Sequence, residues 1–117
     1  LLGAPWRENN KLYNAALLLE NGKISAKRFK HVLPTYGVFD EQRVFSQGPI
    51  PGPIRFNEIK LGVMICEDMW QQDVAEGLQE TGADILVVMN GSPFEVDKPD
   101  QRLNLAISRV KEYSDRQ

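Results

Sequence analysis

The chain has 117 residues, of which 42% are hydrophobic and 26% charged, a composition typical of one soluble globular domain. A net charge of −2 without a basic stripe argues against nucleic-acid binding, and no apolar run approaches the roughly 20 residues that cross a bilayer. One cysteine, Cys66, excludes an internal disulfide, and with one histidine, His31, we expect no metal site. We therefore expect a cytoplasmic protein with neither a membrane nor a nucleic-acid partner.

The first half of the chain predicts strands followed by a long loop. Residues 1–6 are interpreted as the end of a buried strand. Residues 11–19 and 23–29 predict two strands joined by a turn at Asn21 and Gly22, because both residues tolerate positive φ. The many prolines and glycines of residues 30–53 indicate a loop, and its aromatic side chains indicate that the loop is packed.

The second half predicts a strand–helix–strand unit and a last helix. A short hairpin leads into a buried strand that ends at Cys66, and a helix capped by Asp73 ends at Gly82. Residues 83–90 predict a strand buried on both faces, and Asp100 is expected to cap the last helix. That helix has apolar residues at helical spacing, namely Leu103, Ala106, Ile107, Val110 and Tyr113. The fold class is therefore α/β, with layered sheets and helices.

Cys66 has two interpretations. Most free cysteines are small, inert core residues, but Cys66 ends a buried strand, where α/β sheets place ligands and reactive groups. The acids Glu67 and Asp68 follow it and disfavour a thiolate, so a nucleophilic Cys66 needs a cation nearby. Lys30 is one candidate, although most lysines are solvated. His31 is the other, since histidine is the usual base for a catalytic cysteine, and spacing does not decide between them.

The motifs KHVLPTYGVFDEQRVF (residues 30–45) and GVMICEDMW (residues 62–70) resemble the nitrilase superfamily of carbon–nitrogen hydrolases. VFDE, CEDMW and MNGSPFEVDK (residues 89–98) resemble, within it, the glutamine-hydrolysing domain of the glutamine-dependent NAD synthetases. The resemblance implies part of a nitrilase-like α-β-β-α sandwich with a Glu–Lys–Cys triad. Cys66 would attack the side-chain amide of glutamine, forming a thioester and releasing ammonia. Lys30 and the backbone N–H of Glu67 would stabilise the oxyanion, and Glu41 would orient Lys30. His31 is then a loop residue.

The resemblance also implies a glutamine pocket. Free glutamine carries an ammonium and a carboxylate, so the pocket needs an acid and a cation. Glu67 and Tyr36 would receive the ammonium, and Ser92 and Lys98 the carboxylate. An ordinary turn at Ser92 and a solvated Lys98 are the alternatives. Asp68 and Trp70 are expected to serve packing and hydrogen bonding.

By this resemblance, residues 1–117 are the central part of the glutamine amidotransferase domain. We assign neither Glu8 nor Glu20 as the general base, which we expect outside the chain together with the first strands, the domain end and the synthetase domain. No cofactor is expected within the chain; ATP, Mg and deamido-NAD would bind the synthetase domain, and a homo-oligomer is expected. Alone, the chain is predicted to be inactive and to aggregate or fold poorly.

Two other functions stay open from the sequence. A stand-alone amidase or nitrilase acting on a small amide would use the same fold, but CEDMW and VFDE disfavour it. A non-enzymatic chain would keep Cys66 only as a core residue.

Overall fold

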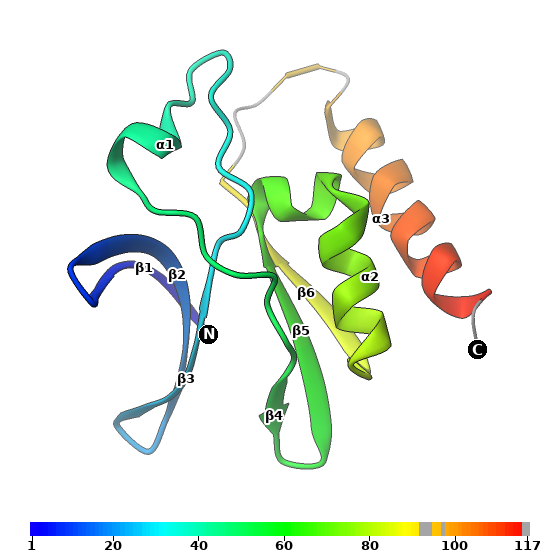
Figure 1. Ribbon diagram of the computed structural model, residues 1–117. Helices are drawn as coiled ribbons and strands as arrows, with labels where there is room; N and C mark the ends of the chain where they lie inside the picture. The colour runs from blue at the N-terminus through cyan, green and yellow to red at the C-terminus, as the bar shows by residue number, and fades with distance from the viewer. Residues whose placement is uncertain (92–94, 97, 116–117) are drawn as a thin grey trace.

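The computed structural model describes residues 1–91, 95–96 and 98–115. Its elements in chain order are β1 (Leu2–Glu8), β2 (Lys11–Glu20), β3 (Lys23–Phe29), α1 (Glu41–Val44), β4 (Ile54–Phe56), β5 (Ile59–Ile65), a 3₁₀ helix (Cys66–Trp70), α2 (Gln72–Glu80), β6 (Ile85–Met89) and α3 (Lys98–Ser114). Figure 1 shows two groups of strands, with α2 and α3 beside the second group and the α1 loop above the first. The α/β fold class is confirmed.

The first sheet is antiparallel, in the order β1-β2-β3. The predicted turn is confirmed, since Asn21 has a φ of 52° and Gly22 a φ of 73°, and it joins β2 to β3. The prediction of a buried strand at the start of the chain is wrong. The residues of β1 alternate between exposed and half-buried, because β1 lies at the edge of its sheet and pairs with β2 alone among the described strands.

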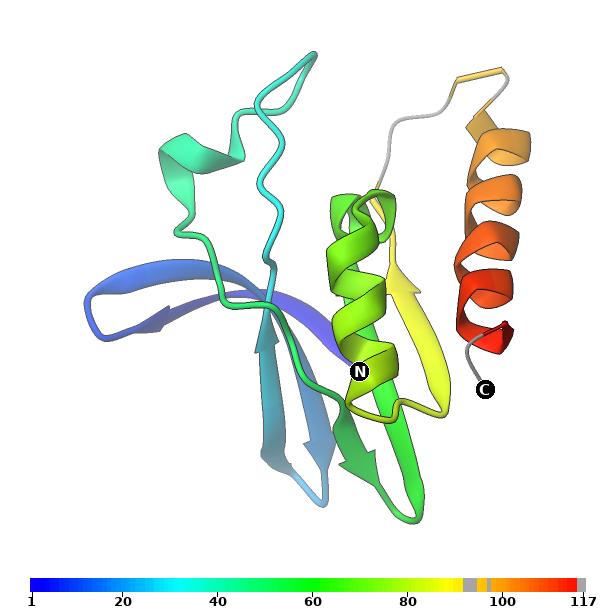
Figure 2. The ribbon, with the colours of Figure 1, turned by 45° about the vertical axis from the view of Figure 1, so that its right-hand side comes forward.

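The second sheet has the order β4-β5-β6, with β5 and β6 parallel and α2 in the connection between them. Side chains of β5 alternate between two apolar layers, as the period of a strand requires. Val63 and Ile65 pack with Ala16 of the first sheet, whereas Met64 packs with Leu78 of α2. The sheets therefore face each other, with α2 on the outer face of the second sheet (Figure 2).

Two of the predicted helix caps are wrong, although both helices form. The helix α2 begins at Gln72, so Asp73 lies inside its first turn and accepts a hydrogen bond from the Val74 N–H at 2.9 Å. Asp100 likewise lies in the first turn of α3. An acid in a first turn still interacts favourably with the helix dipole. The predicted end of α2 is confirmed, because Gly82 has a φ of 84° directly after the C-cap.

Burial of the last two elements is lower than their apolar sequences indicate. The strand β6 is half-buried rather than buried on both faces, because it lies at the edge of the described sheet. In α3, Leu105 and Ala106 pack against the core, while Leu103, Ile107 and Val110 are exposed. None of the helices in the described part of the chain has the length and apolar character needed to cross a membrane.

Candidate active site

Cys66 lies in a sharp turn at the carboxyl end of β5. It opens the 3₁₀ helix Cys66–Trp70, which the sequence did not indicate, and its φ is 49°. The left-handed region costs a residue with a side chain about 1–2 kcal/mol, so a cysteine there is strained. A strand, a strained residue and a helix in succession are also the parts from which nucleophile elbows are built. The backbone at Cys66 therefore favours a functional thiol over an inert core cysteine.

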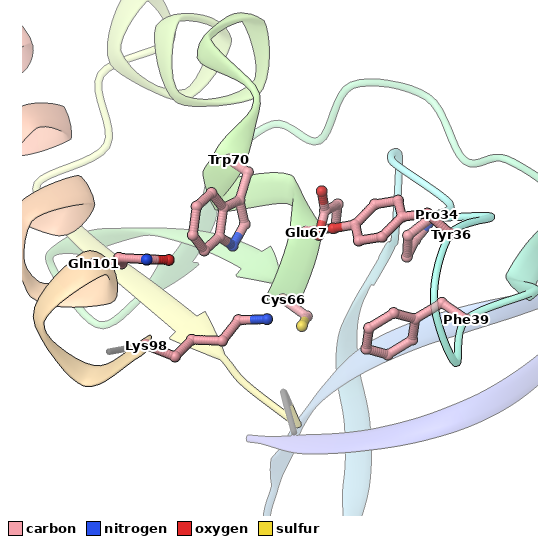
Figure 3. A pocket seen from close by; sticks show the side chains of 8 residues that line it. All are labelled: Pro34, Tyr36, Phe39, Cys66, Glu67, Trp70, Lys98 and Gln101. Atoms are coloured by element: carbon pink, nitrogen blue, oxygen red, sulfur yellow. Dashed lines mark hydrogen bonds between the residues drawn. The ribbon is translucent and has the colours of Figure 1, made fainter. Parts of the chain in front are cut away.

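The thiol opens into a pocket of about 200 Å³. Its lining residues are Pro34, Tyr36, Phe39, Cys66, Glu67, Trp70, Lys98 and Gln101 (Figure 3). A volume below the usual 300–1,000 Å³ of drug-sized sites suits a small substrate. The pocket brings together four of the predicted site residues, and it adds Pro34, Phe39 and Gln101, for which the sequence analysis predicted no role. Trp70, expected only to pack, also lines the pocket. Ser92 lies outside the described residues.

Opposite charges flank the thiol in this pocket. The Tyr36 hydroxyl donates a hydrogen bond of 2.7 Å to Glu67 Oε2, and this bond raises the pKa of Tyr36 to about 12. Figure 3 shows Tyr36 and Phe39 on one side of Cys66, and Lys98 and Gln101 on the other. The half-buried Lys98 lines the pocket, so the interpretation of a fully solvated lysine does not hold. An acid on one side and a cation on the other complement a free amino acid.

Lys30 is buried and paired. Its side chain is 1% exposed, and its ammonium donates to Glu41 Oε1 at the start of α1. Asn14 of β2 contacts the same pair from the first sheet. Its side-chain amide donates to Glu41 Oε2 at 3.3 Å, and its backbone carbonyl accepts from the backbone N–H of Lys30 at 2.8 Å. The alternative of a solvated Lys30 is therefore wrong. The sequence analysis missed Asn14, although a lone polar residue within the apolar run of β2 was the available signal.

Asp68 links the segment after Lys30 to the turn at Cys66. Its side chain is 1% exposed. Oδ1 accepts hydrogen bonds from the backbone N–H groups of His31 at 3.1 Å and Val32 at 2.8 Å, and Oδ2 accepts from Ile65 at 3.1 Å. Burial raises the pKa of the Asp68 carboxyl, and the three backbone donors and the Lys30 ammonium oppose that rise. The expected hydrogen-bonding role is thus observed, between two specific segments.

His31 is engaged with the backbone rather than with the pocket. Its Nδ1 lies 2.8 Å from the carbonyl oxygen of Gly48, and because a carbonyl only accepts, Nδ1 carries the proton. The Gly48 N–H in turn donates to the Lys30 carbonyl at 2.9 Å. Neither His31 nor Lys30 lines the pocket of Cys66, so the assignment of Lys30 as the cation beside the thiol rests on the family resemblance.

Gly48→Ala is predicted to displace Lys30. A Cβ at position 48 would lie 2.6 Å from the Phe29 Cβ and 3.0 Å from the backbone oxygens of Phe29 and Lys30. We expect a loss of about 1–3 kcal/mol in the free energy of unfolding, because backbone has to move, and slower alkylation of Cys66 by iodoacetamide. Gly52→Ala is the matched control, since nothing lies within 4 Å of a Cβ there. Equal results for the two variants would contradict the prediction.

Hydrogen bonds from α3 support the turn that follows Cys66. Arg109 of α3 donates from Nε to the Met69 carbonyl at 3.1 Å and from Nη2 to the Trp70 carbonyl at 3.2 Å, which joins α3 to the 3₁₀ helix.

Glu8, left without a catalytic role, forms an ion pair with Lys27 at 2.7 Å in the first sheet. Within residues 1–91, 95–96 and 98–115, no three His, Cys, Asp or Glu side chains gather in a way that could hold a metal ion.

Known proteins resemble this chain over nearly its whole length. The glutamine-dependent NAD(+) synthetase of Rhodobacter capsulatus is 43% identical over 111 residues, which are 95% of this chain and 20% of that protein. The solved structure of the glutamine-dependent NAD+ synthetase from Acinetobacter baumannii, in complex with ADP, has a TM-score of 0.89 at 34% identity. It matches 95% of this chain and 21% of its own. The chain thus spans about a fifth of the length of these relatives.

A second solved structure widens the comparison beyond the synthetases. Nit3 of Saccharomyces cerevisiae, a member of branch 10 of the nitrilase superfamily, has a TM-score of 0.73 at 27% identity and matches 95% of this chain and 40% of its own. Residues 1–112 match the family described as carbon–nitrogen hydrolase. The chain therefore has the nitrilase-superfamily fold that the sequence analysis expected. The chain belongs to the carbon–nitrogen hydrolase family.

Proposed function

We propose that residues 1–117 are the central part of the glutamine amidotransferase domain of a glutamine-dependent NAD synthetase. The observation that carries the proposal is the pocket in which Cys66 lies between the Tyr36–Glu67 pair and Lys98. An α-ammonium at Glu67 and an α-carboxylate at Lys98 would leave the side-chain amide of glutamine directed at the thiol. The names of the relatives support the same substrate.

The proposed chemistry divides amide hydrolysis into two steps. The thiolate of Cys66 attacks the amide carbon of glutamine, and the carbonyl oxygen becomes an oxyanion. Lys30, oriented by Glu41, and the backbone N–H of Glu67 stabilise that charge. The C–N bond then breaks, and the nitrogen takes up a proton and leaves as ammonia. Water hydrolyses the γ-glutamyl thioester, which releases glutamate and restores the thiol. The general base that moves these protons is not assigned within the chain.

The reactions of the whole protein are part of the same proposal. Ammonia released at Cys66 would amidate deamido-NAD to NAD in a synthetase domain, with ATP and Mg bound there rather than to these residues. A homo-oligomer in the cytoplasm would fit this role. A stand-alone amidase acting on a small amide is the alternative, and the charged groups on both sides of Cys66 argue against it, because a small neutral amide carries no charge to complement them.

NAD formation from different nitrogen donors distinguishes the NAD synthetase from the stand-alone amidase. The full-length protein would be given ATP, Mg and deamido-NAD with either glutamine or an ammonium salt, and NAD would be measured. We expect NAD from both sources, with glutamine the better donor at low concentration. Ammonia release from small neutral amides, with no NAD formed from either source, would favour the amidase.

Tyr36→Phe is predicted to weaken glutamine binding with little effect on chemistry. The variant removes the 2.7 Å hydrogen bond that orients Glu67. Tyr36 is 57% exposed, so water competes with this bond. A contribution of about 0.5–1 kcal/mol then predicts a rise of about two- to fivefold in the KM for glutamine, with kcat nearly unchanged. Because the pKa of Tyr36 is raised to about 12, its hydroxyl keeps its proton throughout the usual assay range, and KM should show no tyrosine titration near pH 10.

Steady-state kinetics with glutamine check this prediction. Tyr13→Phe is the control, because Tyr13 stacks on Phe29 in the first sheet, with ring centroids 4.2 Å apart, and does not line the pocket. A fall in kcat with KM unchanged would contradict the role given to Tyr36.

A further inference from the structure

Asp68 is a buried acid to which the proposed chemistry assigns no step. Its carboxylate lies where the ends of two strands from different sheets come together. Oδ1 binds the N–H groups of His31 and Val32, directly after Lys30, and Oδ2 binds the N–H of Ile65, directly before Cys66. One rigid group of a few atoms therefore connects the neighbours of the proposed cation to those of the proposed nucleophile.

We propose that Asp68 is a positioning residue that sets the distance between Lys30 and Cys66. This inference rests on the proposed function, because it uses the roles given there to the two residues. Asp68 binds backbone N–H groups and does not line the pocket, so it acts through the two segments it joins. Misplacement of a catalytic group by about 1 Å can lower a rate about 100-fold, which makes such a link consequential.

The packing of the two sheets explains why a polar link is needed here. Elsewhere in the interface, apolar side chains such as Ala16 and Val63 meet. Apolar contacts are non-directional, so they hold the sheets together without fixing one strand end against another. Hydrogen bonds depend on both distance and angle. Three bonds to one fully buried carboxylate therefore define the position of the Lys30 segment relative to the turn at Cys66.

Asparagine at position 68 breaks this link without changing the size of the side chain. An amide has one acceptor oxygen and one NH₂ group, which only donates. With its oxygen in the place of Oδ1, the NH₂ group faces the N–H of Ile65; in the other orientation it faces the N–H groups of His31 and Val32. Either orientation retains one segment and repels the other.

The test measures alkylation of Cys66 in the full-length protein. A diazoketone analogue of glutamine yields the maximal inactivation rate constant (kinact) and the binding constant (KI) separately. For Asp68→Asn we expect kinact to fall about 100-fold and KI to change less than about threefold, since the pocket residues stay in place. A merely structural acid would lower the thermal midpoint and leave kinact per folded molecule unchanged, and that result would overturn the proposal.

Two control variants separate positioning from general destabilisation. Asp84→Asn makes the same substitution at the opposite end of β5, where Asp84 Oδ2 accepts from the Lys60 N–H at 2.8 Å. Arg109→Gln removes buried bonds to the same 3₁₀ helix, from the side of α3. For Asp84→Asn we expect kinact to stay within about threefold of wild type. For Arg109→Gln we expect a loss in kinact at least about ten times smaller than the loss in Asp68→Asn. Equal losses for Arg109→Gln and Asp68→Asn would contradict a specific link to Lys30.

A second variant covers the case in which Asp68→Asn does not fold. Val32→α-hydroxyvaline replaces the backbone N–H, which donates at 2.8 Å, by an ester oxygen. We again expect kinact to fall, here by about tenfold, while KI stays nearly unchanged. An unchanged kinact would overturn the proposal. Iodoacetamide lacks the glutamine moiety. If it alkylates Cys66 while the diazoketone does not, the glutamine assignment fails, and the ratio of iodoacetamide rates for wild type and variant still decides the role of Asp68.

Discussion

Cys66→Ala is expected to abolish NAD formation from glutamine in the full-length protein and to leave NAD formation from ammonium intact. Loss of a nucleophile typically costs a factor of about 10⁴ or more in kcat, whereas ammonium supplied from solution does not need the thiol. The measurement compares NAD formed from the two nitrogen sources by wild type and variant. Retention of glutamine-dependent activity in Cys66→Ala would mean that the cysteine is only a core residue.

The stability of Cys66 variants tests the strained turn separately. Cys66 has a φ of 49°, and alanine at that position keeps the strain while glycine removes it. We expect Cys66→Gly to exceed Cys66→Ala by about 0.5–1 kcal/mol in the free energy of unfolding, with both variants inactive toward glutamine. A less stable glycine variant would contradict the left-handed backbone at Cys66.

Lys30→Met is expected to lower both stability and reactivity. The Glu41 carboxylate, 16% exposed, would lose its ammonium partner, and removal of one member of a buried ion pair costs about 3–5 kcal/mol. Loss of the cation should also slow thioester formation by about 100–1,000-fold, as loss of one oxyanion donor does. Chemical denaturation and single-turnover glutamine hydrolysis measure the two effects.

Two further variants separate these effects of Lys30. The double variant Lys30→Met/Glu41→Gln removes both charges and should recover most of the lost stability, but none of the lost reactivity, because the cation is still absent. Lys98→Met removes the lysine that lines the pocket and should raise the KM for glutamine without a comparable loss of stability. Recovery of activity in the double variant would show that Lys30 serves only to neutralise Glu41.

The fold was predictable where the signal is local. The turn at Asn21 and Gly22 depends on residues that tolerate positive φ, and it formed as expected. The burial of β1 and β6 was not predictable, because it depends on which elements lie beside each strand rather than on the strand's own residues. The caps at Asp73 and Asp100 failed for a related reason: both helices begin earlier, and an acid in the first turn is stabilised almost as an acid at the cap would be.

The candidate site also has parts that the sequence predicted and parts that it did not. The motifs that carry the family resemblance pointed to Cys66, Lys30 and Glu41, and the structure pairs Glu41 with Lys30. Residues that act across long separations were missed, such as Asn14 on Glu41 and Arg109 on the 3₁₀ helix. Asn14 left one indirect signal, as a lone polar residue in the apolar run of β2, but a single sequence does not show which residue each of these side chains contacts. The left-handed backbone at Cys66 was equally invisible, since glycine or asparagine usually marks that conformation.

Cys66 is proposed to be an activated nucleophile in a glutamine pocket, and intact mass spectrometry tests this proposal most directly. The full-length protein would be treated with the diazoketone analogue of glutamine, with and without excess glutamine, and the modified peptide sequenced. We predict one adduct, on Cys66, that glutamine suppresses and that Cys66→Ala does not form. An unmodified Cys66, or an adduct that glutamine does not suppress, would contradict the account.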